Sequence, residues 1–333
     1  MKNQEDFYED DKYFEYIHKI RTEFRSKALP NNIKLIEADN GCLIYIVGTA
    51  HYSQESINDV DYIMNNVNPD YLVIELCNNR ANILLSDEDE IKDSLKNVTL
   101  GDIVKKNGTI NGALQYLLLK ISARVTKDTG LIPGGEFRTG YRLANLQRHC
   151  HIILGDRRIE ITLQRAFQSL SFFKKIYMML SILADFRPIT KEEIEEMKNT
   201  DILEKELLKI SHKFPELKRI IVDERDLYLA KSIHEAAYNS RCCLKWSSSP
   251  SKVVVAIVGI GHMNGIVKSW DRVSEVNKSE LEKKIEETMS WKIFKTSAKT
   301  TLTVGTVLVS YFIIKVSVKL SSKAINKLIK LNL

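Results

Sequence analysis

The fold of this chain is decided by two stretches, Cys42-Leu-Ile-Tyr-Ile-Val-Gly-Thr-Ala-His51 and Val253-Val-Val-Ala-Ile-Val-Gly-Ile-Gly-His262. Each is a run of mostly branched aliphatic residues, followed by Gly-x-x-His and then by a segment with helical character. Such a run predicts a buried strand, so each histidine should stand at the carboxyl end of a strand. Open α/β sheets bind their ligands at that edge, which makes the two imidazoles the first candidates for a functional site.

The residues around the first stretch extend this pattern. Two strands are expected at 33–38 and 42–47, joined by Asp39-Asn-Gly41, a typical hairpin turn. Residues 56–59 have the S-x-x-D form of a helix start, and a second buried strand is expected at 71–76. A strand, a helix and a strand in this order predict parallel strands with a right-handed crossover.

The rest of the chain alternates in the same way. A helix is expected from 136 to about 148, a strand at 150–154 and a last strand at 252–258, and 281–294 reads as an exposed, charged helix. The pattern predicts an α/β fold: a central, mostly parallel sheet with flanking helices, a helical insertion and a C-terminal membrane-anchor helix. The predicted division is 1–30, an N-terminal helical extension; 31–275, the α/β domain, with the insertion at about 161–240; 276–299, a linker helix; and 300–333, the anchor and basic tail.

Composition narrows the class of protein. The 333 residues are 44% hydrophobic with a formal net charge of +6, which suits a globular protein. Because no folded segment combines Arg/Lys enrichment with interleaved aromatic residues, we expect no nucleic-acid partner. The five cysteines form no Cys-x-x-Cys pair, which favours a reducing compartment. The acidic N-terminus lacks the apolar run of a secretory signal, so the domain should face the cytosol.

The C-terminal segment has a different character. Residues 300–320 are mostly apolar and long enough for a membrane-spanning helix of about 20 residues, although Lys315 interrupts them. Lysines flank the segment on both sides, as in a tail anchor, and Lys315 could reach the headgroups. The alternative is an amphipathic helix that packs on the domain or lies on a membrane surface.

Polar residues end four of the strand-like runs: His51, Glu75, Asp156 and His262. Two imidazoles with one or two carboxylates suit a divalent metal ion with open positions for water, and such an ion promotes hydrolysis. A plainer interpretation exists for each residue. A single histidine often only satisfies hydrogen bonds, Glu75 has Arg80 as a structural partner close in sequence, and Asp156 could form a turn and an ion pair with the arginines that follow it.

Further candidates lie on predicted helices. Glu136 follows two glycines that let the backbone approach a ligand, or it simply favours a helix N-terminus. Arg225 could bind a carboxylate or a carbonyl oxygen with two donors, while the surrounding run 223–226 also reads as a solvated helix start. The sequence contains no Gly-x-Ser-x-Gly elbow, P-loop, Gly-x-Gly-x-x-Gly fingerprint or His-Glu-x-x-His helix.

Taken in order, these motifs resemble the TraB/PrgY family, which is related to the Tiki proteins. The resemblance runs from about residue 43 to 266. The matching stretches are Gly48-Thr-Ala-His51, Pro69-Asp70, Val73-Ile-Glu-Leu-Cys-Asn-Asn-Arg80, Gly130-Leu-Ile-Pro-Gly-Gly-Glu-Phe-Arg138, Leu154-Gly-Asp-Arg157, Ile161-Thr-Leu-Gln-Arg-Ala166, Glu224-Arg-Asp226 and Gly259-Ile-Gly-His-Met-Asn-Gly-Ile266. Two positions depart from the family pattern: Tyr52 stands where a small aliphatic residue is usual, and Arg158 stands where proline is common.

The resemblance implies an α/β fold with a site built around the two Gly-x-x-His elements and acidic residues. Bacterial relatives are associated with control of peptide pheromones, Tiki relatives are similar to metal-dependent peptidases, and eukaryotic relatives with C-terminal anchors are associated with the mitochondrial outer membrane. The matched site positions are His51, Glu75, Arg80, Glu136, Asp156, Arg157, Glu224, Arg225 and His262.

The leading hypothesis is therefore a membrane-anchored, cytosol-facing protein with a metal-dependent peptidase or hydrolase site that acts on peptides. The predicted ligands of its divalent metal ion are His51, Glu75, His262 and Asp156. The predicted catalytic groups are Glu136 or Glu224 as general base, and Arg225 or Arg157 as electrostatic clamp. The alternative is a non-catalytic adaptor, or binding protein, at the mitochondrial outer membrane. Neither hypothesis fixes the oligomeric state.

Overall fold

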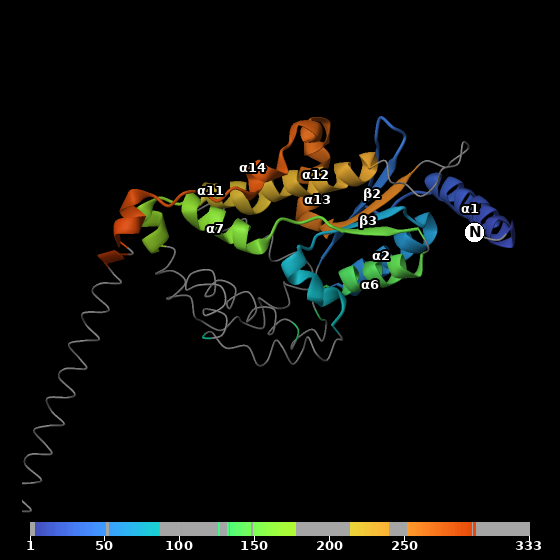
Figure 1. Cartoon of the computed structure of the whole chain (residues 1–333), viewed down its shortest axis with the longest axis horizontal. Coiled ribbons are helices and arrows are strands. Elements are labelled where there is room, and N and C mark those ends of the chain that lie inside the picture. Colours follow the sequence, from blue (N-terminus) through green and yellow to red (C-terminus); the bar gives the residue numbers. More distant parts are fainter. Residues whose placement is uncertain are drawn as a thin grey trace, which may run out of the picture.

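The computed structural model (Figure 1) describes residues 4–50, 53–86, 101, 126, 132, 134–147, 149–177, 214–239, 252–294 and 296–297. Its centre is a five-stranded sheet in the order β1-β2-β5-β3-β4. The strands are β1 (Ile33–Glu37), β2 (Leu43–Thr49), β3 (Tyr71–Ile74), β4 (His151–Leu154) and β5 (Val253–Gly259). Only β1 runs antiparallel to its neighbour, which confirms the prediction of a mostly parallel sheet.

The antiparallel strand is joined to the sheet by the predicted hairpin. The amide of Ala38 donates to the carbonyl of Cys42 at 2.9 Å, and Gly41 adopts a φ of 78°. A positive φ is strained for residues with a side chain, which explains the glycine at this turn. The hairpin places β2 so that its other edge pairs with β5.

The register of β2 and β5 brings the first residues of the two Gly-x-x-His elements, Gly48 and Gly259, to one edge of the sheet. In this parallel pair Gly48 lies opposite Val258 and Thr49 lies opposite Gly259. The two elements therefore leave neighbouring strands at nearly the same level. Strand β3 is parallel to β2, as predicted, but β5 lies between the two.

Helices cover both faces of the sheet. The helices α2 (Gln54–Val67) and α6 (Gly135–Leu146) pack on one face, and α12 (Glu224–Tyr238) and α13 (Ile260–Ser269) on the other. The residues of β2 and β5 are all buried, as expected for strands covered on both sides. The sequence interpretation assigned α12 to the helical insertion, whereas its apolar side chains form part of the central core.

Shorter elements connect these layers. They are η1 (Asn78–Leu84), α7 (Ile159–Ser169), α11 (Pro215–Lys218), the π-helix η2 (Arg219–Asp223), η3 (Trp270–Glu275) and α14 (Lys278–Glu282). Residues 178–213 of the helical insertion predicted at about 161–240 lie outside the described residues.

Helix α2 begins one turn earlier than the sequence suggests. Its N-cap is Ser53, whose hydroxyl accepts a hydrogen bond from the amide of Ser56 at 3.3 Å. Ser56, the predicted start, lies inside the helix and accepts from the amide of Ala50 at 2.9 Å. Both serines can satisfy a free backbone amide, so the local sequence does not distinguish between them.

The N-terminal extension is helical, as predicted, and α1 (Gln4–Arg25) packs on the domain. Its residues Ile17 and Phe24 are buried, and the guanidinium of Arg21 donates to the backbone carbonyl of Val67 at 3.0 Å. The same guanidinium lies 3.1 Å from the carboxylate of Asp70, where β3 begins. These contacts fix α1 at the end of the sheet opposite to the two Gly-x-x-His elements.

The predicted helix at 281–294 is wrong in one respect. Helix α14 ends at Glu282, residues 284–288 have no regular structure, and a second helical segment covers 289–294. The chain turns between them because Trp291 is only 2% exposed and packs against Phe167. No helix in the described ranges is long and apolar enough to cross a membrane. The predicted anchor, 300–333, lies outside those ranges.

Candidate functional site

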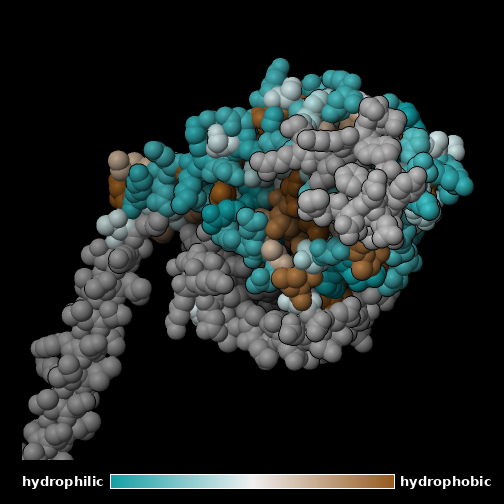
Figure 2. Space-filling model, turned by 45° about the vertical axis from the view of Figure 1, so that its right-hand side comes forward, coloured by the Kyte–Doolittle hydropathy of each residue, from teal (hydrophilic) through white to brown (hydrophobic). Residues whose placement is uncertain are grey.

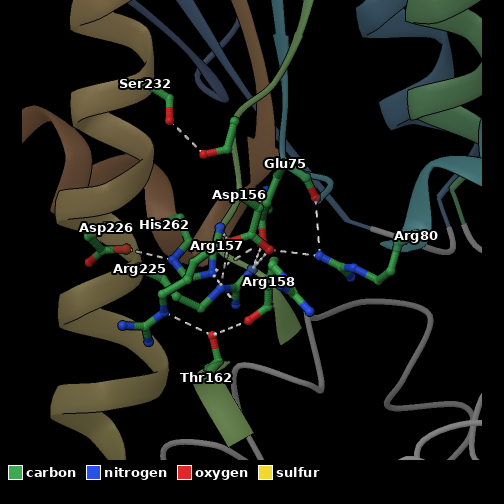
Figure 3. Close-up of polar contacts among 12 residues, drawn as sticks. Glu75, Arg80, Asp156, Arg157, Arg158, Thr162, Arg225, Asp226, Ser232 and His262 are labelled. Carbon is green, nitrogen blue, oxygen red and sulfur yellow. Dashed lines mark hydrogen bonds and ion pairs between the residues drawn. The ribbon is translucent and has the colours of Figure 1, made fainter. Parts of the chain in front are cut away.

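The site is organised around the guanidinium group of Arg225, in the first turn of α12 (Figure 3). Its Nε and Nη2 donate to the two carboxylate oxygens of Asp156 at 3.1 and 3.0 Å, and Nη2 also contacts Oε1 of Glu75. Glu75 follows β3 and Asp156 lies two residues after β4, so both carboxylates come from the carboxyl edge of the sheet. The sheet topology thus brings together residues 150 positions apart in the sequence.

The charges of this cluster hold one another in place. Burial alone would lower the pKa of Arg225, but the carboxylates of Asp156 and Glu75 outweigh burial and raise it. The two-pronged contact with Asp156 is the strong, directional form of an arginine ion pair. Glu75 is fixed further because its Oε2 accepts from the amide of Gly259 at 2.6 Å, which ties the end of β3 to the end of β5.

His262 lies in the first turn of α13, directly beside this cluster. Its Nδ1 is 2.5 Å from the carboxylate of Asp226, and its Nε2 is 3.0 Å from Nη1 of Arg225. An arginine nitrogen can only donate, so Nε2 is the acceptor and Nδ1 carries the proton. Asp226 therefore sets both the orientation and the tautomer of the imidazole, as the aspartate of a catalytic dyad or the outer partner of a metal-ligating histidine does.

The Asp226 carboxylate is held close to α13. Burial raises its pKa above the usual aspartate value, and the hydrogen bond from His262 opposes this effect. The close approach is made possible by Gly265, where an added Cβ would overlap the Asp226 carboxylate. Glycine is thus required here because Asp226, which together with His262 forms the pair that we call the dyad, approaches α13 closely, and not because the chain turns.

Replacing Gly265 by alanine should separate the dyad. Alanine is about 1 kcal/mol better than glycine within a helix, but overpacking a filled site costs about 1–3 kcal/mol. We expect a net loss of about 1–2 kcal/mol in urea unfolding and the disappearance of the downfield Nδ1 proton resonance of His262. Asn264→Ala, at an exposed neighbour, is the control and should change neither quantity. An unchanged proton resonance in Gly265→Ala would contradict this account.

His262 and Glu75 have the chemistry and spacing of adjacent metal ligands. Nε2 of His262 lies 3.4 Å from Oε1 of Glu75. Two ligands of a tetrahedral ion with bonds of about 2.1 Å are also separated by about 3.4 Å. In this structure the guanidinium of Arg225 contacts both atoms. Among the described residues no group of three or more His, Cys, Asp or Glu side chains is arranged to hold a metal, and the predicted ligand His51 lies outside those residues.

Arg80, on η1, forms the solvent-facing side of the cluster. Its Nη2 donates to Asp156 at 2.7 Å and lies 3.4 Å from the backbone carbonyl of Glu75. The side chain is 39% exposed, against 11% for Arg225. The sequence interpretation paired Arg80 with the Glu75 carboxylate, but Arg225 takes that place and Arg80 pairs with Asp156.

Glu224 and Arg157 lie in a second, neighbouring ion-pair network. Arg157 is fully buried and donates to Glu224 at 2.7 Å, and Arg165 binds the same carboxylate with two nitrogens at 2.9 Å. Arg157 also donates to the backbone carbonyls of Ile220 and Leu281, both at 2.9 Å. The structure thus does not bring these two predicted catalytic residues to His262. Together with Arg165, they join α7, η2, α12 and α14.

This network predicts a loss of stability in acid. Burial opposes ionisation of Glu224, but hydrogen bonds from Arg165 and Arg157 outweigh it, so the pKa of Glu224 lies below its usual 4.5. Its contribution to stability is therefore complete above about pH 4.5 and is lost as the pH falls through the lowered pKa. Urea unfolding between pH 7 and pH 3 should show this loss.

The matched variant is Glu224→Gln. At neutral pH it should lower the free energy of unfolding by about 1.5–3 kcal/mol, because charged hydrogen bonds are lost. Below pH 4.5 the difference from the native chain should shrink. A difference that is constant from pH 7 to pH 3 would show that Glu224 is not the titrating group.

Glu136 lies on the other side of the sheet edge. It is 1% exposed and belongs to the first turn of α6. The preceding Gly135 packs against Ile57 in the first turn of α2, which follows the carboxyl end of β2. Glu136 is thus at the same edge as His262 but in the opposite helical layer.

Asp226 is the residue of this site that sequence reasoning did not select. The signal was available in Glu224-Arg-Asp226, where the residue after the proposed clamp is again acidic. On a helix, consecutive residues point about 100° apart, so Arg225 and Asp226 can face one site while Glu224 faces another. Only the packing of α12 against α13 shows which two of the three do so.

Known proteins resemble this chain over most of its length. The TraB/PrgY/gumN family model matches residues 33–277. Proteins called TraB domain-containing protein are 37% identical in Mus musculus and 36% identical in Homo sapiens over 259 residues, which cover 76% of this chain and 69% of each relative. A protein from Methanocaldococcus jannaschii is 27% identical over 308 residues, covering 90% of this chain and 70% of the relative.

Proposed function

The chain belongs to the TraB/PrgY/gumN family, and from this premise we propose that it is a membrane-attached, metal-dependent hydrolase of peptides. The observation that carries the proposal is the state of His262. Asp226 fixes its Nδ1 at 2.5 Å, and its Nε2, which accepts a hydrogen bond from Arg225, lies 3.4 Å from Oε1 of Glu75. A histidine oriented by a carboxylate is the usual form of a metal-ligating imidazole.

The charges of the site also favour a cation. Among the described residues the site contains the carboxylates of Glu75 and Asp156, which pair with the guanidinium groups of Arg80 and Arg225, and the carboxylate of Asp226, which contacts His262. When all are ionised, these residues leave one negative charge in a largely buried place. Such an excess is costly unless a cation or a proton balances it.

In the proposed site His262 and Glu75 hold the divalent ion, and His51 is the third ligand expected from the sequence. When bound, such an ion supplies Lewis acidity and a water molecule of lowered pKa. Asp226 keeps the imidazole in the ligating tautomer, while Arg225 compensates Glu75 and Asp156. Arg80 has the more exposed guanidinium and could bind an oxygen of the substrate.

Glu136 is the proposed general base. It lies at the same sheet edge, whereas Glu224 is held by Arg157 and Arg165. We further propose that residues 300–320 attach the protein to the mitochondrial outer membrane with the domain facing the cytosol. A peptide or protein is the proposed partner, and nucleic acid is not.

One observation favours a second function, that of a non-catalytic adaptor. The guanidinium of Arg225 contacts both Nε2 of His262 and Oε1 of Glu75, the two atoms that would hold the metal. A site closed by its own ion pairs could persist as a binding surface.

The two functions are separated by a cleavage assay. The full-length protein is stripped with a chelator, reloaded with Zn²⁺, Mn²⁺ or Co²⁺, and incubated with a mixture of peptides that is analysed by mass spectrometry. We expect cleavage with at least one ion and a loss of at least about 100-fold in His262→Ala. The exposed neighbour substitution Asn264→Ala is the control. A folded protein that retains peptides but cleaves none with any ion would favour the adaptor.

A further inference from the structure

Large apolar side chains are exposed at the end of the described molecule where the helical segments 172–177 and 289–294 meet. They form the terminal apolar patch, which consists of Phe173, Tyr177, Met289, Ile293 and Phe294. Phe173 is 80% exposed and Met289 is 70% exposed. Figure 2 shows apolar atoms at the left-hand end of the face in view, beyond the hydrophilic surface of the domain. An apolar patch of this kind on the solvent-exposed surface of a protein usually marks a contact with a partner or a membrane.

Aromatic contacts make the patch continuous. Phe172, on the first segment, connects the two, because its ring centroid lies 5.6 Å from that of Phe173 and 5.5 Å from that of Phe294. Met289 and Ile293 are four residues apart on one helical segment and therefore share a face. Phe173 and Tyr177 have the same spacing on the other segment.

The patch is fixed rigidly to the domain. Beneath it Trp291 is buried, with its ring centroid 5.2 Å from that of Phe167 on α7. The ammonium group of Lys175 is fully buried and lies 5.3 Å from the Phe167 ring and 5.4 Å from the Trp291 ring. It also donates to the side chain of Gln168 at 3.1 Å. The point at which the chain leaves the domain is therefore held in a defined place.

The sequence that follows limits the distance between the patch and the predicted anchor. Phe294 precedes Thr300 by six residues. Six residues span about 9 Å as a helix and at most about 20 Å when extended. The headgroup region of a bilayer is about 6 Å thick on each side of the hydrocarbon core. When residues 300–320 enter a membrane, the patch must then lie close to the headgroups.

The composition of the patch suits that position. Aromatic residues are enriched at membrane interfaces, where an amphipathic ring contacts both headgroups and acyl chains. Lys292 is exposed on the same segment, and Lys295 and Lys299 follow in the sequence. Each lysine near an anionic surface contributes about 1 kcal/mol of attraction.

We propose that the terminal apolar patch inserts into the headgroup region of the membrane that residues 300–320 enter. The protein then has two membrane contacts, and the second one fixes the orientation of the domain and its site relative to the bilayer. This inference goes beyond peptide hydrolysis and rests only on the proposed membrane attachment.

The test is lipid photolabelling of the full-length protein. The protein is reconstituted into vesicles of phosphatidylcholine and an anionic phospholipid that contain a lipid with a photoactivatable group near its headgroup. Labelled peptides are then identified by mass spectrometry. We expect label on 171–177 and 289–294, and none on the peptide that contains Leu146, which is 72% exposed on α6. Phe173→Ser with Ile293→Ser should reduce the label on 289–294 severalfold, and Leu146→Ser should not.

The outcomes separate this inference from the proposed anchor. Label on residues 300–320 without label on the patch overturns the patch and leaves the anchor standing. Label on the patch without label on 300–320 overturns the anchor and the proposal of two membrane contacts, and leaves the patch as the membrane contact. A protein that does not associate with the vesicles overturns both. Cleavage of peptides is not involved in any of these results.

Discussion

Replacing Arg225 by methionine is expected to lower the free energy of unfolding by about 3–5 kcal/mol. The guanidinium is the shared partner of Glu75 and Asp156, whose side chains are 5% and 1% exposed. Methionine preserves most of the volume but leaves two carboxylates buried with less compensation. Urea unfolding of the full-length protein, followed by circular dichroism, measures the change.

Two further variants show whether charge or geometry is responsible. Arg225→Lys keeps the charge but lacks the planar group that binds Asp156 with two donors. The free energy of unfolding should therefore fall by less than it does in Arg225→Met. Arg219→Met removes another arginine six residues earlier, which is 59% exposed and pairs with Glu224 at 3.4 Å. Arg219→Met should lower the free energy of unfolding by no more than about 1 kcal/mol. Equal effects at 225 and 219 would show that the buried cluster has no special role.

Replacing Asp226 by asparagine should reduce the rate of peptide cleavage at least about 100-fold while changing stability little. An asparagine amide can donate to Nδ1 of His262 and so favour the other tautomer. The proton would then lie on Nε2, the atom that faces Glu75 and Arg225. Asp226 is thus a positioning residue that acts through His262.

The matched control is Asp223→Asn, three residues earlier. Asp223 is 48% exposed on the side chain and pairs with Lys218 at 2.7 Å, so its substitution should leave cleavage unchanged. A purely structural role for Asp226 would lower Tm and leave the cleavage rate per folded molecule unaltered. The histidine proton resonances of the variant, which report the tautomer, provide a readout independent of cleavage.

Much of the scaffold follows from local sequence. The aliphatic runs at 43–49 and 253–259 predict buried strands, and the turn at 39–41 predicts the hairpin. The structure contains both. The position of Glu75 within an apolar run, and of Asp156 after another, also placed their carboxylates correctly at one sheet edge. These features depend on neighbours in the chain, which the sequence displays directly.

Other features could not be predicted in this way. Residues 281–294 have the composition of one exposed helix, yet the burial of Trp291 against α7 divides them. Glu224 and Asp226 look equivalent in a charged run, but one binds Arg157 and the other His262. In each case the structure depends on which element packs against these residues in the folded protein. Short sequence patterns contain no information about such tertiary neighbours.

The sequence by itself thus determined the strands and the sheet edge at which the two Gly-x-x-His elements begin, because strand periodicity and parallel topology are enough for these, and the ordered series of motifs determined the family. Only the tertiary structure decided that Arg225 would bridge Glu75, Asp156 and His262, and that Asp226 would orient the imidazole. The physical reason is that contacts between α12, α13 and the sheet edge join residues 36 to 150 positions apart, and a shift of one residue along α12 would present a different charge to His262.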